Sequence, residues 1–122
     1  MSLLGPASRR PALRIVYRMR PDLYDPTDDV GHPLLVVSVD VVTRTARVVT
    51  RTSSYEARGP RAVSHPADPA LGLDRPGWWR VFKSHRVPWL NFDHPDVLIL
   101  GPLGDPTWTR LLAEMYGNGG SK

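Results

Sequence analysis

Frequent chain breakers are the feature that most limits how this chain can fold. Thirteen prolines and ten glycines are spread over 122 residues, so the segments between them are short. Both residue types interrupt helices, and the apolar residues between them include many valines, which favour strands. The pattern predicts a small β-rich domain and argues against a helix bundle.

The spacing of the apolar segments predicts a series of short strands. We expect these at residues 13–18, 34–41, 45–52 and 97–100, with one or two more between 78 and 90. In the hairpin formed by the second and third segments, matching the valines places Asp40 opposite Arg47. One face of this hairpin is then apolar and the other charged.

One helix is expected near the C-terminus. Asp105 is a good N-cap residue, Pro106 suits the first helical position, and Gly117 suits the position just after the last turn. The apolar residues between these boundaries recur at helical spacing, which indicates a helix that packs one stripe on a sheet: Trp108, Leu111, Leu112 and Met115.

Length and composition limit the chain to one domain. We expect residues 12–117 to form it, between a disordered basic N-terminus at 1–11 and a disordered tail at 118–122. Apolar runs such as 34–37 and 97–100 are far shorter than the roughly 20 residues of a membrane-spanning helix. The N-terminal residues lack the apolar core of a secretory signal, so a cytoplasmic protein is expected.

Arginine dominates the positive charge. Only two of the 16 basic residues are lysine, and the formal net charge is +4. The planar guanidinium suits bidentate contacts with phosphate, which makes nucleic acid a plausible partner. The alternative is a coding bias that replaces lysine by arginine without any ligand.

Five arginines and one acidic residue lie within residues 44–61. In a strand, Arg47 and Arg51 share a face about 13 Å apart, a spacing that suits two phosphates of an extended single strand. Arg58 and Arg61 follow in the next loop and extend the basic segment. The alternative is an ordinary solvated face.

The sequence T-R-T-S-S at residues 50–54 places four hydroxyls and an arginine near the end of the third predicted strand. Arg51 can stabilise charge on a phosphodiester, while Thr52 and Ser53 can hydrogen-bond the same group. The alternative is turn chemistry, because serine and threonine hydroxyls often bind nearby backbone amides.

Four sequence motifs occur in an order known from one protein family. They are H-P-L-L-V-V-S at 32–38, V-V-T-R-T-S at 48–53, L-D-R-P at 73–76, and L-G-P-L at 100–103 before the terminal helix. Together they resemble the MazF/PemK/Kid-type ribonuclease toxins over roughly residues 33–115.

The resemblance implies a mainly β fold, a small SH3-like β-barrel with one C-terminal α-helix. It also implies a homodimer that cleaves single-stranded RNA and is silenced by an antitoxin. In the family, an arginine beside the proline and the threonine of Thr-Ser act at the scissile phosphate. The threonine corresponds to Thr52, and His32 occupies the arginine position. The family's N-terminal R-G-D/E-I motif has no counterpart at 13–23.

RNA cleavage of this kind requires proton transfer but no cofactor or metal, because the 2′-hydroxyl is the nucleophile. Histidine titrates near neutral pH, so His32 and His65 are the candidates for this role. The alternative for each is a surface or capping histidine. The aspartates at 22–29 lack the spacing of a calcium loop.

Four tryptophans could include a platform on which RNA bases stack. Trp78 and Trp79 are adjacent, and neighbouring strand residues point to opposite faces, so one of them is the best candidate. Two other functions stay open at this point. One is a non-catalytic RNA- or protein-binding SH3-like barrel, and the other is a β-domain whose arginines bind no ligand.

Overall fold

The computed structural model describes residues 10–28 and 31–117. Of the termini expected to be disordered, residues 1–9 and 118–122 lie outside the described residues, whereas residues 10 and 11 are described. Pro11 is buried, and the guanidinium of Arg10 lies 5.3 Å from the ring centroid of Trp89. No helix in the described part of the chain has the length and apolar character needed to cross a membrane.

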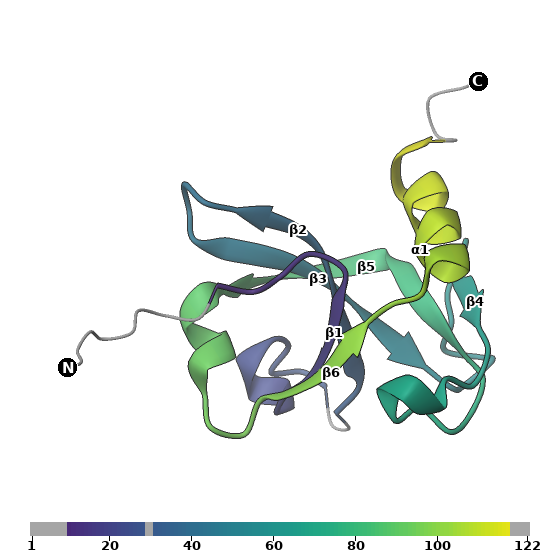
Figure 1. The fold of residues 1–122 in the computed structure, drawn as a ribbon, viewed down its shortest axis with the longest axis horizontal. Helices are drawn as coiled ribbons and strands as arrows, with labels where there is room; N and C mark the ends of the chain where they lie inside the picture. The colour runs from purple at the N-terminus through teal and green to yellow at the C-terminus, as the bar shows by residue number, and fades with distance from the viewer. Residues whose placement is uncertain (1–9, 29–30, 118–122) are drawn as a thin grey trace.

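The described residues form one curled, six-stranded antiparallel sheet (Figure 1). The strand order is β4-β5-β3-β2-β1-β6. The strands are β1 (Ile15–Arg18), β2 (Pro33–Asp40), β3 (Thr45–Thr52), β4 (Val63–His65), β5 (Gly77–Pro88) and β6 (Leu98–Pro102).

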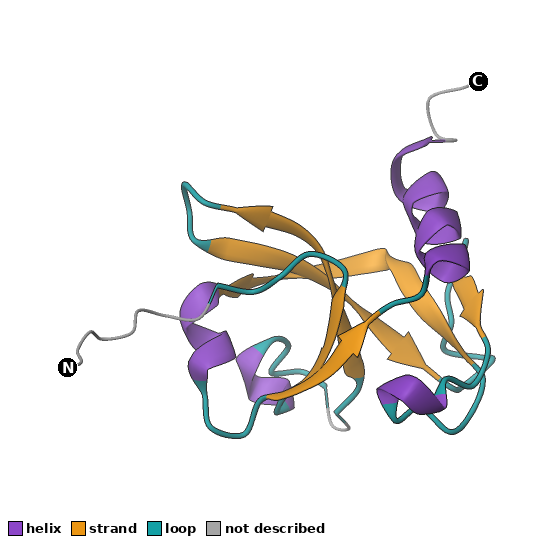
Figure 2. Ribbon diagram, in the orientation of Figure 1, coloured by secondary structure: helices purple, strands orange, loops and turns teal. Residues whose placement is uncertain are grey.

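Helical segments lie at the ends and sides of the sheet (Figure 2). Helix α1 (Asp105–Leu112) continues into a π-helical turn, η4 (Ala113–Gly117). Three short 3-10 helices connect strands: η1 (Pro21–Leu23), η2 (Pro69–Leu71) and η3 (Trp89–Asp93). The mainly β class with a C-terminal helix is confirmed.

Most predicted elements are present, with two differences. Strand β4 was not expected, because its three residues lie in a segment dominated by turn-forming residues. The N-cap of α1 is Gly104 and not Asp105, whose carboxylate instead pairs with Arg14. The carbonyl of Gly104 accepts the hydrogen bond from the Trp108 amide.

The register predicted for the β2–β3 hairpin is wrong, by two residues near the turn and by three beyond the irregularity between Val36 and Ser38. Arg47 lies opposite Ser38, and Asp40 lies opposite Thr45. The cause is the side chain of Asp40, which accepts hydrogen bonds from two backbone amides of the loop 41–44 at 2.9 and 3.2 Å. This turn closes the hairpin directly after Asp40, so no pair forms with Arg47.

Strand β5 contains a wide irregularity where it pairs with β3. Val49 pairs with Ser84 and Arg51 pairs with Trp79, so residues 80–83 of β5 lie opposite a single residue of β3. Such bulges bend a strand and change the direction of its side chains. Arg80 and Lys83 therefore line a cavity beside the sheet.

Buried side chains form two apolar clusters, and alternate residues of β1, β2 and β3 belong to different clusters, as a two-residue period requires. The first cluster includes Trp79 and Leu111 of α1, and the second includes Tyr24 and Phe92. The sheet is therefore supported on both faces.

Candidate functional site

The candidate site lies where β2 begins and β3 ends. Leu34 pairs with Thr50 in the antiparallel register, so His32, two residues before Leu34, and Thr52, two residues after Thr50, lie toward the same end of the two strands. Two cavities meet at this point, of about 300 and 490 Å³. His32, Thr52 and Ser53 line both of them.

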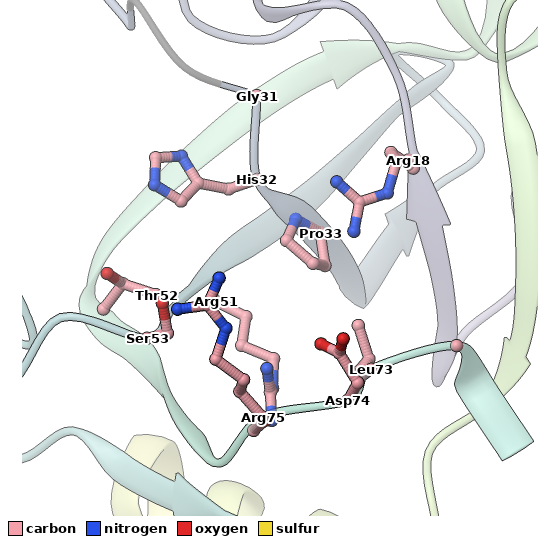
Figure 3. Close-up of a pocket in the computed structure, with 11 residues that line it drawn as sticks. Arg18, Gly31, His32, Pro33, Arg51, Thr52, Ser53, Leu73, Asp74 and Arg75 are labelled. Atoms are coloured by element: carbon pink, nitrogen blue, oxygen red, sulfur yellow. The ribbon is translucent and has the colours of Figure 1, made fainter. Parts of the chain in front are cut away.

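The smaller cavity is rich in arginine. Arg18, Arg51 and Arg75 line it, together with the carboxylate of Asp74 (Figure 3). Arg18 comes from β1, Arg51 from β3 and Arg75 from the loop before β5. These three cations come from separate parts of the chain and line one cavity. Their combined positive charge favours an anionic group there.

The larger cavity has charges of both signs. Lys83 Nζ lies 3.9 Å from Asp25 Oδ2, and Asp28 lines the same cavity. A hydrogen bond from the Thr27 hydroxyl lowers the pKa of Asp25. Among the described residues, the buried Nε of Arg80 has no hydrogen-bond partner.

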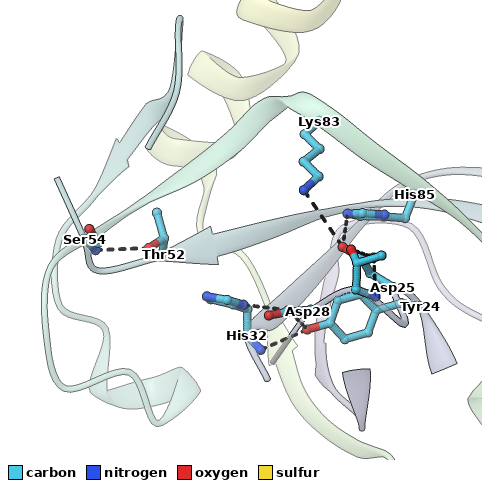
Figure 4. A network of polar contacts seen from close by, with 9 residues as sticks. Tyr24, Asp25, Asp28, His32, Thr52, Ser54, Lys83 and His85 are labelled. Carbon is cyan, nitrogen blue, oxygen red and sulfur yellow. Dashed lines mark hydrogen bonds and ion pairs between the residues drawn. The ribbon is translucent and has the colours of Figure 1, made fainter. Parts of the chain in front are cut away.

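His32 belongs to a hydrogen-bonded cluster with Tyr24 and Asp28 (Figure 4). His32 Nδ1 lies 2.9 Å from Asp28 Oδ2, and the Tyr24 hydroxyl donates to the same oxygen at 2.6 Å. The backbone amide of His32 donates to the Tyr24 oxygen at 3.1 Å. Because an ionised carboxylate only accepts, Nδ1–H of His32 is the donor to Asp28, and Nε2 has no hydrogen-bond partner among the described residues.

The phenol of Tyr24 is a stable part of this cluster. Burial and the neighbouring Asp28 carboxylate raise the pKa of Tyr24 above its ordinary value. Tyr24 therefore remains a donor to Asp28 across the physiological pH range. His32 is held at two points, because its ring contacts Asp28 and its backbone amide donates to Tyr24. Its side chain is 23% exposed.

Arg51 was expected at the phosphate, but its guanidinium is committed to the protein itself. Its residue is only 5% exposed, and Nε donates to His65 Nδ1 at 2.9 Å. Nη2 donates to the carbonyls of His65, Pro66 and Arg75 at 3.3, 3.3 and 2.8 Å. Arg51 therefore ties the end of β3 to the loop 66–76.

His65 is the second candidate for proton transfer, but it is buried in the same network. It is 3% exposed, its ring stacks on Trp79, and its Nε2 lies 3.1 Å from Asp68 Oδ2. Burial, reinforced by the charge of Arg51, lowers the pKa of His65. Both ring nitrogens have protein partners, so His65 is a structural residue here and not a proton carrier.

The other predicted residues are spread over the molecule. Thr52 is buried and its hydroxyl oxygen accepts a hydrogen bond from the Ser54 amide at 3.0 Å, whereas Ser53 is exposed. Arg47 lies toward the opposite end of β3, facing Arg86. The exposed Arg47 and the buried Arg51 therefore do not form a pair of phosphate contacts.

Two loop arginines also lie apart from the cavities. Arg58 stacks on Tyr55, and Arg61 Nε lies 3.7 Å from Glu114 of η4. The structure thus gathers His32, Thr52, Ser53 and Arg51 at the cavities. Of the other predicted arginines, Arg47, Arg58 and Arg61 line neither cavity.

Sequence reasoning missed Tyr24 and Asp28, and it missed Arg18 and Arg75. Asp28 precedes His32 by four residues, but in an irregular loop this spacing fixes no geometry. Arg75 lies in the L-D-R-P motif, which was noted for its family resemblance alone. That motif was the one available signal.

Comparison with known proteins gives one structural finding. No family model and no curated protein matches the sequence. A chain in the crystal structure of MazE–MazF (form II) from Deinococcus radiodurans superposes with a TM-score of 0.62. It is 18% identical, and the match covers 93% of this chain and 99% of that chain. At this identity the likeness indicates a MazF-like fold.

Proposed function

We propose that this protein is an endoribonuclease of the MazF type, built on an SH3-like barrel, that cleaves single-stranded RNA as the toxin of a toxin–antitoxin pair. The fold likeness and the ordered sequence motifs support this assignment. The observation that carries the chemistry is the Tyr24–Asp28–His32 cluster at the junction of the two cavities. It supplies an oriented imidazole where the family has an arginine.

In the proposed reaction, the 2′-oxygen of RNA attacks the adjacent phosphorus. The 2′-hydroxyl proton passes to Nε2 of His32, and the imidazolium is stabilised by Asp28 through Nδ1–H. The bond from phosphorus to the 5′-oxygen breaks, and that oxygen takes a proton from solvent. The products are a 2′,3′-cyclic phosphate and a 5′-hydroxyl end, and His32 then releases its proton to solvent.

Other residues would hold the phosphate. Arg18 and Arg75 supply positive charge in the smaller cavity, where negative charge increases on the non-bridging oxygens. The exposed Ser53 and the Thr52 hydroxyl can donate hydrogen bonds to the same group, since Thr52 uses its oxygen only as an acceptor toward Ser54. Arg51 acts indirectly, because it positions the Thr52 strand end.

The partners follow from the same assignment. The structural neighbour is a MazE–MazF complex, so we propose an antitoxin protein as the regulator of this chain. The family resemblance implies a cytoplasmic homodimer. Sedimentation of the purified protein, alone and with a candidate antitoxin, measures both associations.

A cleavage assay tests the activity. A defined single-stranded RNA is incubated with the protein in EDTA, and the ends are mapped. We expect cuts with cyclic phosphate ends, at least a tenfold loss with His32→Ala and with Thr52→Val, and no loss with His94→Ala. His32→Arg should retain RNA binding but lose the pH-dependent limb of the rate.

Two other results separate the alternatives. Retarded but intact RNA would indicate a non-catalytic RNA-binding barrel. Equal rates and equal pH profiles for the wild type, His32→Ala and His32→Arg would remove His32 from the reaction.

A further inference from the structure

An exposed tyrosine is held rigidly beside the candidate site. Tyr55 is 59% exposed, and the guanidinium carbon of Arg58 lies 3.6 Å from its ring centroid. The edge of the Trp78 ring system meets Tyr55 at 5.8 Å and an angle of 75°. Single exposed aromatics are common, but this ring is fixed between a cation and a second aromatic.

The loop that carries Tyr55 is braced by its own hydrogen bonds. Arg58 Nη1 donates to the Tyr55 carbonyl at 2.7 Å, and the Ala57 amide donates to the Ser54 hydroxyl at 3.3 Å. Phe82 then packs against Gly59, where an added Cβ would come within 2.0 Å of the ring. The φ of Gly59 is 77°, which favours glycine for a second reason. The ring of Tyr55 is therefore preordered.

Chain neighbours of these residues line the larger cavity, among them Ser54 and Arg80. Trp78 is the cross-strand partner of Thr52, and Trp79, the next residue, is buried in the first apolar cluster on the other side of β5. Arg80 lies 6.0 Å from the Phe82 ring and also lines the cavity, as does Lys83. Two ring–cation pairs, Tyr55 with Arg58 and Phe82 with Arg80, thus lie on segments that border the larger cavity.

We propose that Tyr55, Arg58 and Trp78 form a stacking platform for a nucleobase of single-stranded RNA, next to the cleaved phosphate. This inference rests on the proposed function and adds a subsite to it. Bases stack on aromatic rings without strict sequence preference, and interleaved cations neutralise the phosphates between them.

Binding to an oligonucleotide that cannot be cleaved tests the platform apart from catalysis. A fluorescent 2′-O-methyl oligoribonucleotide lacks the nucleophile, and its anisotropy reports binding. We expect Tyr55→Ala to weaken binding about tenfold, within the range known for one stacked base, and Tyr55→Phe to restore it. The matched control is Tyr116→Ala, which removes a tyrosine that is 57% exposed on η4 and should change nothing.

A second oligonucleotide with abasic residues identifies the contact. The wild type should bind it more weakly, and Tyr55→Ala should then cause no further loss. The salt dependence should stay unchanged in Tyr55→Ala but become shallower in Arg58→Ala, by about 0.7 in log–log slope for one phosphate contact.

Three outcomes overturn the platform: no measurable binding by the wild type, no effect of Tyr55→Ala, or an equal loss on both oligonucleotides. The last would indicate that the loop has a structural role or serves a protein partner. Binding that depends on Tyr55 in a protein that does not cut RNA would overturn the proposed activity and leave the platform in place. Cleavage of RNA together with binding that Tyr55→Ala leaves unchanged would support the proposed activity and overturn the platform.

Discussion

Two histidine–aspartate pairs in this molecule have nearly the same contact but different surroundings. His32 and His65 each place one ring nitrogen close to a carboxylate oxygen, at 2.9 Å from Asp28 and 3.1 Å from Asp68. The second nitrogen of His65 accepts a hydrogen bond from Arg51 and is buried. Figure 4 shows the second nitrogen of His32 turned away from Asp28.

A histidine–carboxylate pair therefore does not by itself identify a reactive site. In the His65 pair, the third partner uses the lone pair that a base would need, so the pair stabilises the fold. In the His32 pair, the third partner is Tyr24, which binds the carboxylate and the backbone and leaves that lone pair available. The residue that joins each histidine–aspartate pair, Arg51 or Tyr24, therefore determines the role of that pair.

The largest expected effect comes from removing Arg51. Arg51→Met leaves His65 Nδ1 and several buried carbonyls without their donor, so we expect a loss of about 3 kcal/mol in the free energy of unfolding. Urea denaturation measures it. Arg47→Met, on an exposed part of the same strand, should change stability by about 0.5 kcal/mol or less. Similar losses in the two variants would contradict the buried network.

Gly77 touches both Arg51 and Thr52, so it tests how closely the two regions are linked. A Cβ at Gly77 would lie 2.7 Å from the Thr52 carbonyl oxygen and 2.9 Å from the Arg51 guanidinium. Gly77→Ala should cost about 2 kcal/mol, because backbone must shift. Gly31→Ala, where the nearest atom lies 3.9 Å from the added Cβ, is the matched control and should stay near wild-type stability.

Asp28→Asn should separate activity from stability. The amide can still accept a hydrogen bond from Nδ1–H, but it no longer stabilises the imidazolium, so we expect cleavage to slow about tenfold, which is about 1.4 kcal/mol. Stability should fall by less than in Arg51→Met. Single-turnover cleavage of a short RNA provides the rate. An unchanged rate in the folded variant would remove Asp28 from the mechanism.

The pH dependence of stability should report the buried pair. Burial lowers the pKa of His65 below its usual value near 6.5, so the unfolded chain binds the proton first as the pH falls. Stability should therefore decrease below about pH 6.5, by at most about 1.4 kcal/mol per pH unit for each such histidine. Burial lowers the pKa of His85 in the same direction, so the wild type includes both contributions.

His65→Asn isolates one of these contributions. The asparagine oxygen can accept from Arg51 Nε in place of Nδ1, but the side chain does not titrate. Urea unfolding at pH 7, 6 and 5 should show a shallower decline than in the wild type. Identical declines would mean that His65 binds its proton equally well in the folded and unfolded chains.

The sequence predicted the fold better than the site. Proline spacing and valine alternation are local signals, and they located β3 at 45–52 and the helix after Gly104. The role of Arg51 depends on the loop 66–76 folding over its strand face, which no local pattern encodes. The contact between Asp28 and His32 could not be predicted either, because it is formed by an irregular loop.

The irregularity in β5 allows the length of this strand to vary. The pairs Val49–Ser84 and Arg51–Trp79 fix the register on either side independently, so the number of residues between Trp79 and Ser84 is not dictated by the ladder. Removing or adding two residues there would preserve the alternation of both flanks while moving the cationic wall of the larger cavity. Length changes, and not only substitutions, are therefore a route by which such a chain can acquire a different ligand without rebuilding its sheet.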